Sequence, residues 1–283
     1  MSLAPIEVSP RHASADDSHL RDVNAALDRF QPIGLEAVNH AARLQTRKDR
    51  KYVLAARQAA EILRGLSGDV SVLEIDDRRW FGYESIYFDT SRFDSYRLAA
   101  TRRPSRFKVR TRRYLDSGLC VAEVKTKDRR GRTVKHRLAL DSGSGPASDD
   151  VRGFAIGFAE VAPYARHLEP VLVSTYQRAT IALPADHVRV TLDAGYRCVD
   201  ADGRTTGLET DLIIETKTAG RPSSVDRALW AAGHRPLKIS KYATGLAAMH
   251  PELPANRWAS VLRTHFGSPG TNDPASHPDG DIQ

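Results

Sequence analysis

The sequence predicts an α+β fold in which roughly eight strands form one curved sheet, with helices packed against its apolar face. Two observations lead to this prediction. Along several segments apolar and charged residues alternate with a period of two, which is the pattern of a strand with two different faces. Between these segments the apolar residues recur with helical spacing, and such helices need an apolar surface to cover.

The clearest alternation runs from Arg106 to Arg137, as three strands separated by turns at Leu115–Leu119 and Asp128–Arg132. Each strand has one apolar face and one charged face. The charged faces carry Lys108, Arg110, Arg112, Glu123, Lys125, Lys127, Lys135 and Arg137. A single strand of this kind would indicate only a sheet with its core on one side and water on the other. The pattern recurs later in the chain, which argues against that simple interpretation.

The second half of the chain repeats the alternation in Val171–Leu183, His187–Tyr196 and Thr210–Thr218. The charged faces of these segments carry Tyr176, Arg178, Arg189, Asp193, Glu215 and Lys217. The spacing of Glu215 and Lys217 repeats that of Glu123 and Lys125. Further strands are predicted at Thr46–Leu54, Val70–Ile75 and Tyr83–Thr90.

Helices are predicted where apolar residues recur every three or four positions. Short ones are expected around Leu20–Phe30 and after Pro32–Gly34. Longer ones are expected at Ala55–Leu66, Asp150–Arg166, Ser223–Gly233 and from Ser240 to about residue 250, with a further turn from Pro254. The polar ends of the chain are predicted to be disordered. We therefore expect an N-terminal tail with a short helix (1–29), one folded domain (30–266) and a disordered C-terminal tail (267–283).

The net charge of +7 and the pI of about 9.5 indicate anionic partners such as nucleotides, polyphosphates, nucleic acid or an acidic membrane surface. No apolar run approaches the ~20 residues of a membrane span, and the N-terminus lacks the apolar core of a signal peptide. We therefore expect a cytoplasmic protein without a membrane span in this chain. Cys120 and Cys198 form neither a zinc motif nor a disulfide framework.

The predicted sheet can either pack its apolar faces together as a sandwich or close into a barrel with its apolar face outward, beneath the helices. The second arrangement is favoured because the helices at 55–66, 150–166, 223–233 and 240–250 need an apolar face to cover. The interior of the barrel is then polar and basic. Two like charges at ~4 Å repel by ~4 kcal/mol at an effective dielectric constant near 20, so such a lining implies a bound polyanion.

Arginine suits phosphate in particular, because its planar guanidinium makes paired hydrogen bonds to phosphate oxygens. Glu123, Asp193 and Glu215 are too few to neutralise the cations, and they are interpreted as ligands for a divalent metal that accompanies phosphate. For Glu123 a salt bridge to a neighbouring arginine is an equally good interpretation. Ser240 is expected to be a helix N-cap.

A set of motifs then resembles a known family. In order along the chain they are TRKDRKY, YESIYFDT, FKVRTRRY, EVKTK, RGRTVKHR, YQRATI, RVTLD, IIETK and ISKYATGL. They resemble the catalytic domain of the vacuolar transporter chaperone (VTC) family, a polyphosphate polymerase within the CYTH-like triphosphate tunnel metalloenzyme superfamily. The resemblance spans about Phe30 to Phe266. It implies an eight-stranded antiparallel β-barrel that forms a basic tunnel, so that residues 30–266 are a VTC-type tunnel domain.

The resemblance also implies roles for single residues. Those expected to bind and orient the reacting phosphates are Lys51, Arg110, Arg112, Lys125, Arg178, Arg189 and Lys241. Glu215 corresponds to the metal ligand of the family, and Glu123 is the second candidate ligand. Further substrate contacts are expected from Lys127, Arg137, Lys217 and Tyr176, where the tyrosine either stacks on adenine or packs in the core. The superfamily's triphosphatases and cyclases begin with E-x-E-x-K, whereas the first strand here has only Asp49 among basic residues, which disfavours a two-metal hydrolase.

The function that the resemblance implies is transfer of the ATP γ-phosphate to a polyphosphate chain, with Mn²⁺ or Mg²⁺ as cofactor. Two alternatives stay open: a metal-dependent inorganic or nucleoside triphosphatase, and a non-catalytic module that binds polyphosphate or nucleotide. Nucleic-acid binding is not expected, because aromatic residues are only 7% and the basic faces alternate strictly with apolar ones. A membrane-bound partner is possible, since larger family members carry membrane and regulatory domains.

Overall fold

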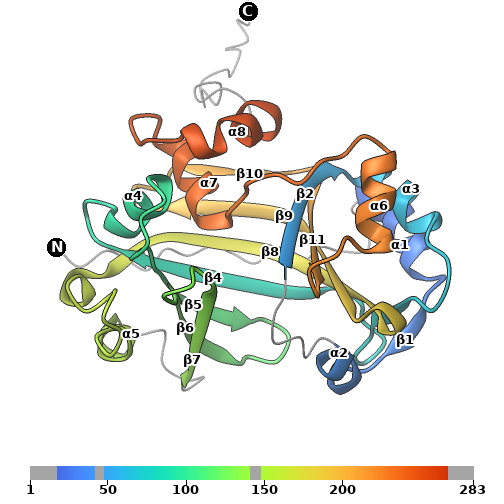
Figure 1. Cartoon of the computed structure of the whole chain (residues 1–283), viewed down its shortest axis with the longest axis horizontal. Helices are drawn as coiled ribbons and strands as arrows, with labels where there is room; N and C mark the ends of the chain where they lie inside the picture. Colours follow the sequence, from blue (N-terminus) through green and yellow to red (C-terminus); the bar gives the residue numbers. More distant parts are fainter. Residues whose placement is uncertain (1–17, 42–47, 141–147, 267–283) are drawn as a thin grey trace, which may run out of the picture.

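The computed structural model of the chain describes residues 18–41, 48–140 and 148–266. Its centre is one curved antiparallel sheet with helices around it (Figure 1). Eight strands follow one another in the hydrogen-bonded order β2 (Lys48–Ala55), β11 (Asp211–Thr218), β9 (Val188–Asp200), β8 (Glu169–Leu183), β4 (Phe81–Asp89), β5 (Lys108–Tyr114), β6 (Cys120–Lys127) and β7 (Thr133–Leu140). The predicted α+β class and the eight antiparallel strands are confirmed.

The sheet differs from the predicted barrel in one respect, because it is not closed. The strands β2 and β7 lie at the two ends of the path, and no hydrogen-bonded pairing joins them within the described residues. Three short strands lie off the path: β1 (Gln31–Ile33), β3 (Ser71–Leu73) and β10 (Thr205–Leu208). In a closed barrel β2 and β7 would pair, whereas here the polar side of the sheet is open between them.

The convex face of the sheet carries the main hydrophobic core, as the alternation predicts. Over β2, β11, β9 and β8 lie the helices α1 (Arg21–Leu27), α3 (Ala56–Arg64) and α6 (Ser224–Ala231). Leu27, Leu63 and Leu229 of these helices pack in one cluster with Tyr52 and Leu192 of the strands. Burial of each such leucine contributes about 1.5–3 kcal/mol. The segment before Phe30 thus belongs to the same core as the sheet.

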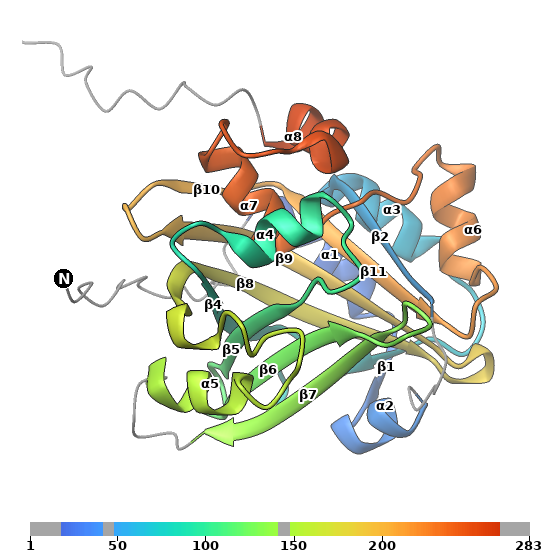
Figure 2. The same cartoon turned by 60° about the vertical axis from the view of Figure 1, so that its left-hand side comes forward.

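A second helix layer covers the other half of the convex face. The helix α5 (Ser148–Ala155) lies against β5 and β6, where Val151 and Ala155 pack on Val109 and Val124 (Figure 2). The sequence predicts a longer helix here, but α5 ends at Ala155 and turns follow it. Glycine and proline have the lowest helix propensities, and Gly157 and Pro163 in this segment account for the early end.

The helix α7 (Lys241–Met249) corrects the prediction that this segment covers an outward strand face. Its residues Tyr242 and Leu246 pack in one cluster with Val53, Tyr87 and Ile213, which point to the same side of the sheet as the cations. In Figures 1 and 2, α7 lies beside α4 (Asp94–Ala100) over β8 and β9. One part of the concave side is therefore apolar and filled by a helix.

A glycine allows α7 to approach the sheet this closely. A Cβ added at Gly245 would lie 2.6 Å from both the Cys198 Sγ and the Tyr196 hydroxyl, which is closer than any real Cβ contact. Any larger residue would push the helix away from β9.

The remaining α-helices of the described residues are α2 (Leu35–Ala41) and α8 (Ala259–His265). None of the helices in the described part of the chain has the length and apolar character needed to cross a membrane. Disorder was predicted for residues 1–18 and 267–283. All of these except Ser18 lie outside the described residues.

Candidate anion-binding cavity

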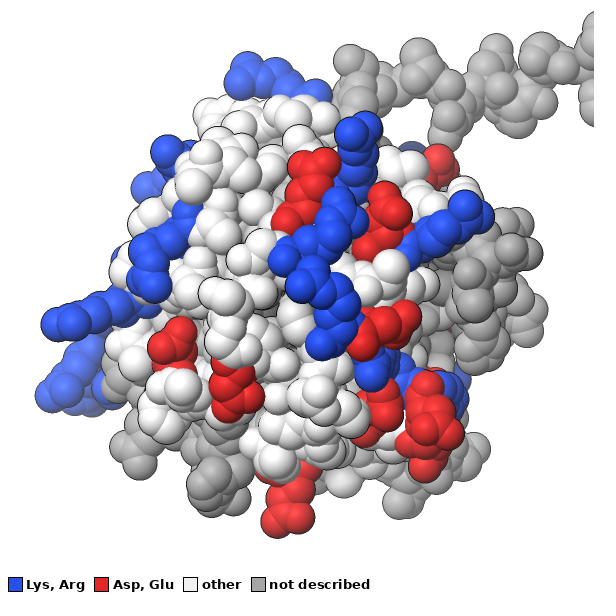
Figure 3. Space-filling view, turned by 90° about the vertical axis from the view of Figure 1, so that its right-hand side faces the viewer, with Lys and Arg blue, Asp and Glu red and all other residues white. Residues whose placement is uncertain are grey.

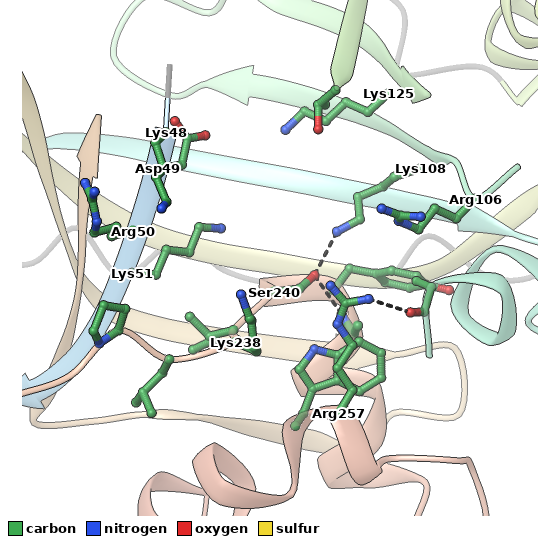
Figure 4. Close-up of a pocket in the computed structure, with 18 of the residues that line it drawn as sticks. Lys48, Asp49, Arg50, Lys51, Arg106, Lys108, Lys125, Lys238, Ser240 and Arg257 are labelled. Carbon is green, nitrogen blue, oxygen red and sulfur yellow. Dashed lines mark hydrogen bonds between the residues drawn. The ribbon is translucent and has the colours of Figure 1, made fainter. Parts of the chain in front are cut away.

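The curvature of the sheet brings its two ends to a common cavity of about 810 Å³. The end strand β2 lines it with Lys48–Lys51, and the other end lines it with Lys108 of β5, residues 125–127 of β6 and Thr133 of β7. Residues 236–240, which precede α7, form another wall. Figure 4 shows Lys51, Lys108 and Lys125 extending from different strands toward the same space.

The charge of this cavity is almost entirely positive. Nine of its lining residues are cations, namely Lys48, Arg50, Lys51, Arg106, Lys108, Lys125, Lys127, Lys238 and Arg257. Asp49 is the one acidic residue among those that line it in the described part of the chain. Such a surplus is costly without an anion, because like charges at short range repel.

Burial and nearby positive charges lower the pKa values of two lysines in the cavity. Burial, with the charges of Lys51, Arg110 and Arg257, lowers the pKa of Lys108 to about 7. The charge of Arg110, together with burial, brings the pKa of Lys125 well below its usual value. An anion in the cavity would favour the charged form of both lysines.

Glu123 lies on the concave face of β6 at the centre of an ion-pair cluster. Its carboxylate accepts hydrogen bonds from Arg110 Nε at 2.7 Å, Arg137 Nε at 2.8 Å and Lys135 Nζ at 3.4 Å. The side chain is fully buried, which by itself raises the pKa of Glu123, but Arg110 and its other cationic neighbours hold that pKa far below its usual range. This is the salt-bridge alternative of the sequence analysis, and it leaves little of the carboxylate for a metal.

A second cluster joins β8, β9 and α7. Asp193 accepts two hydrogen bonds from Arg178, from Nε at 2.6 Å and from Nη2 at 2.8 Å, and it also accepts one from Lys241. Burial opposes ionisation of Asp193, but Arg178 and Lys241 keep its pKa well below the usual value. Burial lowers the pKa of Lys241 to about 8. Arg178 and Lys241 are thus held beside the cavity by protein groups.

Tyr176 connects this cluster to β5. Its hydroxyl accepts a hydrogen bond of 2.8 Å from Arg112 Nη2, and its ring stacks on Tyr83 at 5.3 Å. The Lys241 ammonium lies 4.3 Å from the ring centroid. Only 3% of the residue is exposed. The arrangement matches the core-packing alternative for Tyr176 rather than stacking on adenine, and gives Tyr176 a role in positioning Arg112 and Lys241.

Glu215 differs from Glu123 in its surroundings. It lies directly opposite Lys51 in the pairing of β11 with β2, and its Oε2 is 3.1 Å from Lys217 Nζ. Its side chain is 15% exposed. Burial raises the pKa of Glu215, but Lys51, Lys217 and Arg178 together hold it well below the usual value. The ionised carboxylate therefore stands among the groups that would bind phosphate.

The divalent metal that the resemblance implies would need oxygen ligands at this site. The described residues contain no group of three or more His, Cys, Asp or Glu that could hold a metal ion. Mg²⁺ and similar ions are commonly held by one or two carboxylates, with substrate phosphates and water as the other ligands. Glu215 fits that mode, since its carboxylate is ionised, partly exposed and next to Lys51. Glu123 does not fit it, because three cations already occupy its oxygens.

The structure brings only some of the predicted site residues to the cavity. Lys51, Lys125 and Lys127 line it, and Lys241 follows the lining residue Ser240. The others lie on the same strand faces outside this lining: Arg110, Arg112, Arg137, Arg178, Arg189, Lys217, Tyr176, Glu123 and Glu215. Arg189 lies opposite Lys217 in the pairing of β9 with β11, and burial lowers the pKa of Lys217 to about 8.

Sequence reasoning did not assign a site role to Lys108, Arg106, Lys238, Arg257 or the hydroxyl of Ser240, all of which line the cavity. Lys108 lies on the same strand face as Arg110 and Arg112, so the alternation could have predicted a site role for it. Lys238 and Arg257 lie outside the strands and carry no periodic signal.

The outer surface of the molecule distributes its charges differently. On the face in Figure 3, Lys and Arg form a band with Asp and Glu directly beside it. An exposed ion pair of this kind is Arg57–Glu61 on α3, with 3.4 Å between Nε and Oε1. The unbalanced positive charge is therefore a property of the cavity more than of this outer face.

Comparison with known proteins gives a family. The model of the VTC domain family matches residues 46–250. No curated protein matches the sequence. A solved structure from Hippeastrum, described as an adenylyl cyclase candidate with a dominant triphosphatase activity, has 17% identity and a TM-score of 0.45, covering 69% of this chain and 93% of its own.

Two further structures are similar at the same level. A Vibrio parahaemolyticus protein described as an adenylate cyclase candidate has 13% identity and a TM-score of 0.37, covering 67% of this chain and 87% of its own. The PH1012 protein of Pyrococcus horikoshii has 13% identity and a TM-score of 0.38, covering 66% of this chain and 88% of its own.

Proposed function

From the premise that this chain belongs to the VTC domain family, which the match over residues 46–250 shows, we propose that it is a phosphotransferase that moves the ATP γ-phosphate onto a polyphosphate chain. The observation that carries the proposal is the charge of the cavity, whose lining has nine cations, six of them on the strands β2, β5 and β6, and one acidic residue in the described part of the chain. A phosphate chain presents closely spaced negative charges, and this lining complements them.

In this proposal the cavity lysines bind the triphosphate. Lys51, Lys108 and Lys125 reach one space from three strands, so together they contact phosphates from different directions. Arg110, Arg112, Arg178 and Arg189 lie outside this lining on the same face of the sheet, and they add positive charge beside the cavity. Lys108, Arg110 and Arg178 are bonded to Ser240, Glu123 and Asp193 before the substrate arrives, so these three side chains need little reorganisation when it binds.

The transfer itself needs no general base. A terminal oxygen of the acceptor chain is already ionised near neutral pH, and it attacks the γ-phosphorus. The bond from that phosphorus to the oxygen of the β-phosphate breaks, and ADP leaves with its electron pair. Catalysis of phosphoryl transfer consists mainly of positioning and charge stabilisation, which the lysines and arginines of this site supply.

Glu215 is the residue proposed to hold a divalent cation, Mn²⁺ or Mg²⁺. When bound, such an ion supplies positive charge to phosphate oxygens. Lys51, directly opposite Glu215, would then contact the same phosphate group.

The test is incubation of the purified chain with ATP and Mn²⁺ or Mg²⁺, followed by gel electrophoresis for polyphosphate and an assay for orthophosphate. Formation of long polyphosphate supports the proposal. Release of orthophosphate without polymer would instead identify a triphosphatase. Binding of ATP or tripolyphosphate without turnover would identify a binding module.

A further inference from the structure

The cavity contains a serine–lysine pair that the proposed transfer to polyphosphate does not use. Lys108 Nζ lies 2.7 Å from Ser240 Oγ, and both side chains line the cavity (Figure 4). The two residues are 132 positions apart in sequence, so the contact exists only in the folded chain. A serine hydroxyl next to an amine is the arrangement of a nucleophile with its base.

Capping alone does not explain the lysine. Ser240 is the N-cap of α7, and its Oγ accepts a hydrogen bond of 3.3 Å from the Ala243 N–H. Ser223 caps α6 in the same way, and its Oγ also contacts the carboxylate of Asp226, at 2.9 Å. Ser223 is not among the cavity-lining residues. Both serines therefore cap a helix, but only Ser240 also contacts a lysine.

Lys108 has the surroundings of a proton acceptor. Burial and the charges of Lys51, Arg110 and Arg257 lower its pKa to about 7 before an anion binds. A bound nucleotide raises this pKa, so Lys108 acts as the base only above pH 7, where part of it stays neutral beside the nucleotide. A general base works best when its pKa lies near the working pH. The rings of Tyr87 and Tyr242 lie 5.7 and 5.6 Å from its ammonium and help to keep it in place.

We propose that Ser240 is a phosphoryl acceptor that the protein itself modifies with a nucleoside triphosphate. Ser240 Oγ forms a bond to the γ-phosphorus, the bond from that phosphorus to the β-phosphate oxygen breaks, and the nucleoside diphosphate leaves. The hydroxyl proton passes to Lys108 Nζ. The inference rests on the proposed function, because it uses the same triphosphate in the same cavity.

The new phosphate group is stabilised where it forms. It lies at the positive N-terminal end of α7, a helix of nine residues, beside the charged form of Lys108. Lys51 and Lys238 line the same cavity. The product is thus a phosphoserine in a cationic setting.

The experiment is incubation of the full chain with γ-³²P-ATP and Mn²⁺, followed by denaturation and peptide mapping. Phosphoserine is recognised as an acid-stable, alkali-labile label on the peptide that contains Ser240. Ser240→Asn keeps an N-cap side chain but has no hydroxyl, so this variant is expected to lose the label. Ser223→Ala, the matched loss of an N-cap serine away from Lys108, is expected to keep it.

Lys108→Arg tests the base. It keeps a positive charge but cannot accept a proton, so the initial rate of labelling is expected to fall by about 10²-fold. An unchanged rate in Lys108→Arg overturns the role of Lys108, and equal loss of label in Ser223→Ala and Ser240→Asn overturns the assignment to Ser240.

Polyphosphate is measured in the same samples, so that the two proposals can fail separately. Polymer without label at Ser240 overturns this inference and supports the proposed function. Label at Ser240 without polymer supports this inference and contradicts the polymerase. Absence of both overturns both.

Discussion

Arg178 and Asp193 lie directly opposite each other on β8 and β9 and form two hydrogen bonds, of 2.6 and 2.8 Å. Lys241, at the start of α7, contacts the same carboxylate. One acidic group therefore holds a strand arginine and a helix lysine in fixed positions beside the cavity. The cluster explains how two long cationic side chains stay ordered on a concave wall.

Replacing this acid is expected to destabilise the protein in a way that an anion repairs. In Asp193→Asn, Arg178 and Lys241 lose their counter-charge while buried, and the free energy of unfolding should fall by about 3–5 kcal/mol. Tripolyphosphate should raise the Tm of this variant more than that of the wild type, because it supplies the missing negative charge. Thermal melts with and without tripolyphosphate measure both effects. Glu61→Gln, which breaks the exposed pair with Arg57, should change stability by no more than about 0.5 kcal/mol.

Loss of a cavity lysine is expected to impair catalysis without loss of stability. Lys51→Met removes one of the crowded cations, and kcat/KM for polyphosphate synthesis should fall by about 10²–10³-fold. Its Tm should change little, since Lys51 repels Lys108 but attracts Glu215. Arg57→Ala on the outer face of α3 is the control and should retain activity. Equal activity of the two variants would contradict a catalytic role for the cavity.

The pKa of Lys108 makes anion binding depend on pH. Below pH 7 the lysine is already charged, whereas above pH 7 it must take up a proton when the anion binds. Affinity for tripolyphosphate should therefore fall as pH rises above 7, by up to about tenfold per pH unit from this group. Titration calorimetry in buffers of different ionisation enthalpy measures the proton uptake. At pH 8, Lys108→Arg should take up fewer protons than the wild type, by up to about one.

Stability should depend on pH in the opposite direction. The pKa of Lys108 is about 7 in the folded protein and about 10.4 in an unfolded chain. Between these values the unfolded state binds more protons, so this group makes the free energy of unfolding rise with pH. Lys108→Met should reduce that slope, as measured by urea unfolding at pH 7, 8 and 9. An identical slope in the variant would show that the lysine is not buried among cations.

The two glutamates should give opposite results when each is replaced by glutamine. Glu123→Gln leaves Arg110 and its neighbours without their shared acid, so it should lose about 3–5 kcal/mol of stability. Glu215→Gln should lose less stability than Glu123→Gln, because Glu215 is the more exposed of the two, but it should lose at least about 10²-fold in activity and require more Mn²⁺ for half-maximal rate. Chelation with EDTA should abolish wild-type activity. If Glu215→Gln keeps its Mn²⁺ requirement unchanged, Glu215 is not the metal ligand.

Tyr176→Phe separates positioning from base recognition. The variant loses the hydroxyl that accepts from Arg112 but keeps the ring between Tyr83 and Lys241. If Tyr176 positions Arg112, KM should rise by the same factor for ATP and for tripolyphosphate, by about tenfold or more for a lost hydrogen bond to a charged group. A rise for ATP alone would show that the residue recognises adenine. Steady-state kinetics with the two substrates makes the comparison.

The sequence by itself determined the parts of this protein that depend on local patterns. Alternation at Lys108–Arg112 and Glu215–Lys217 identified strands with one cationic face, because a strand places every second side chain on the same side. Helical spacing identified α3 and α6 as coverings of the apolar face. The ordered motifs also indicated the VTC family, which the match over residues 46–250 shows.

Tertiary structure alone decided how these parts meet. The sheet curves without closing, so Lys51 and Lys125 from distant strands line one cavity. The apolar face of α7 packs on the concave side of the sheet rather than on its convex side. Glu123 and Glu215 differ in role because their neighbours in space differ. The contact between Lys108 and Ser240 likewise joins residues that are far apart in the chain. Periodicity reports the face on which a side chain lies, whereas its partner across space depends on the twist and packing of the whole sheet.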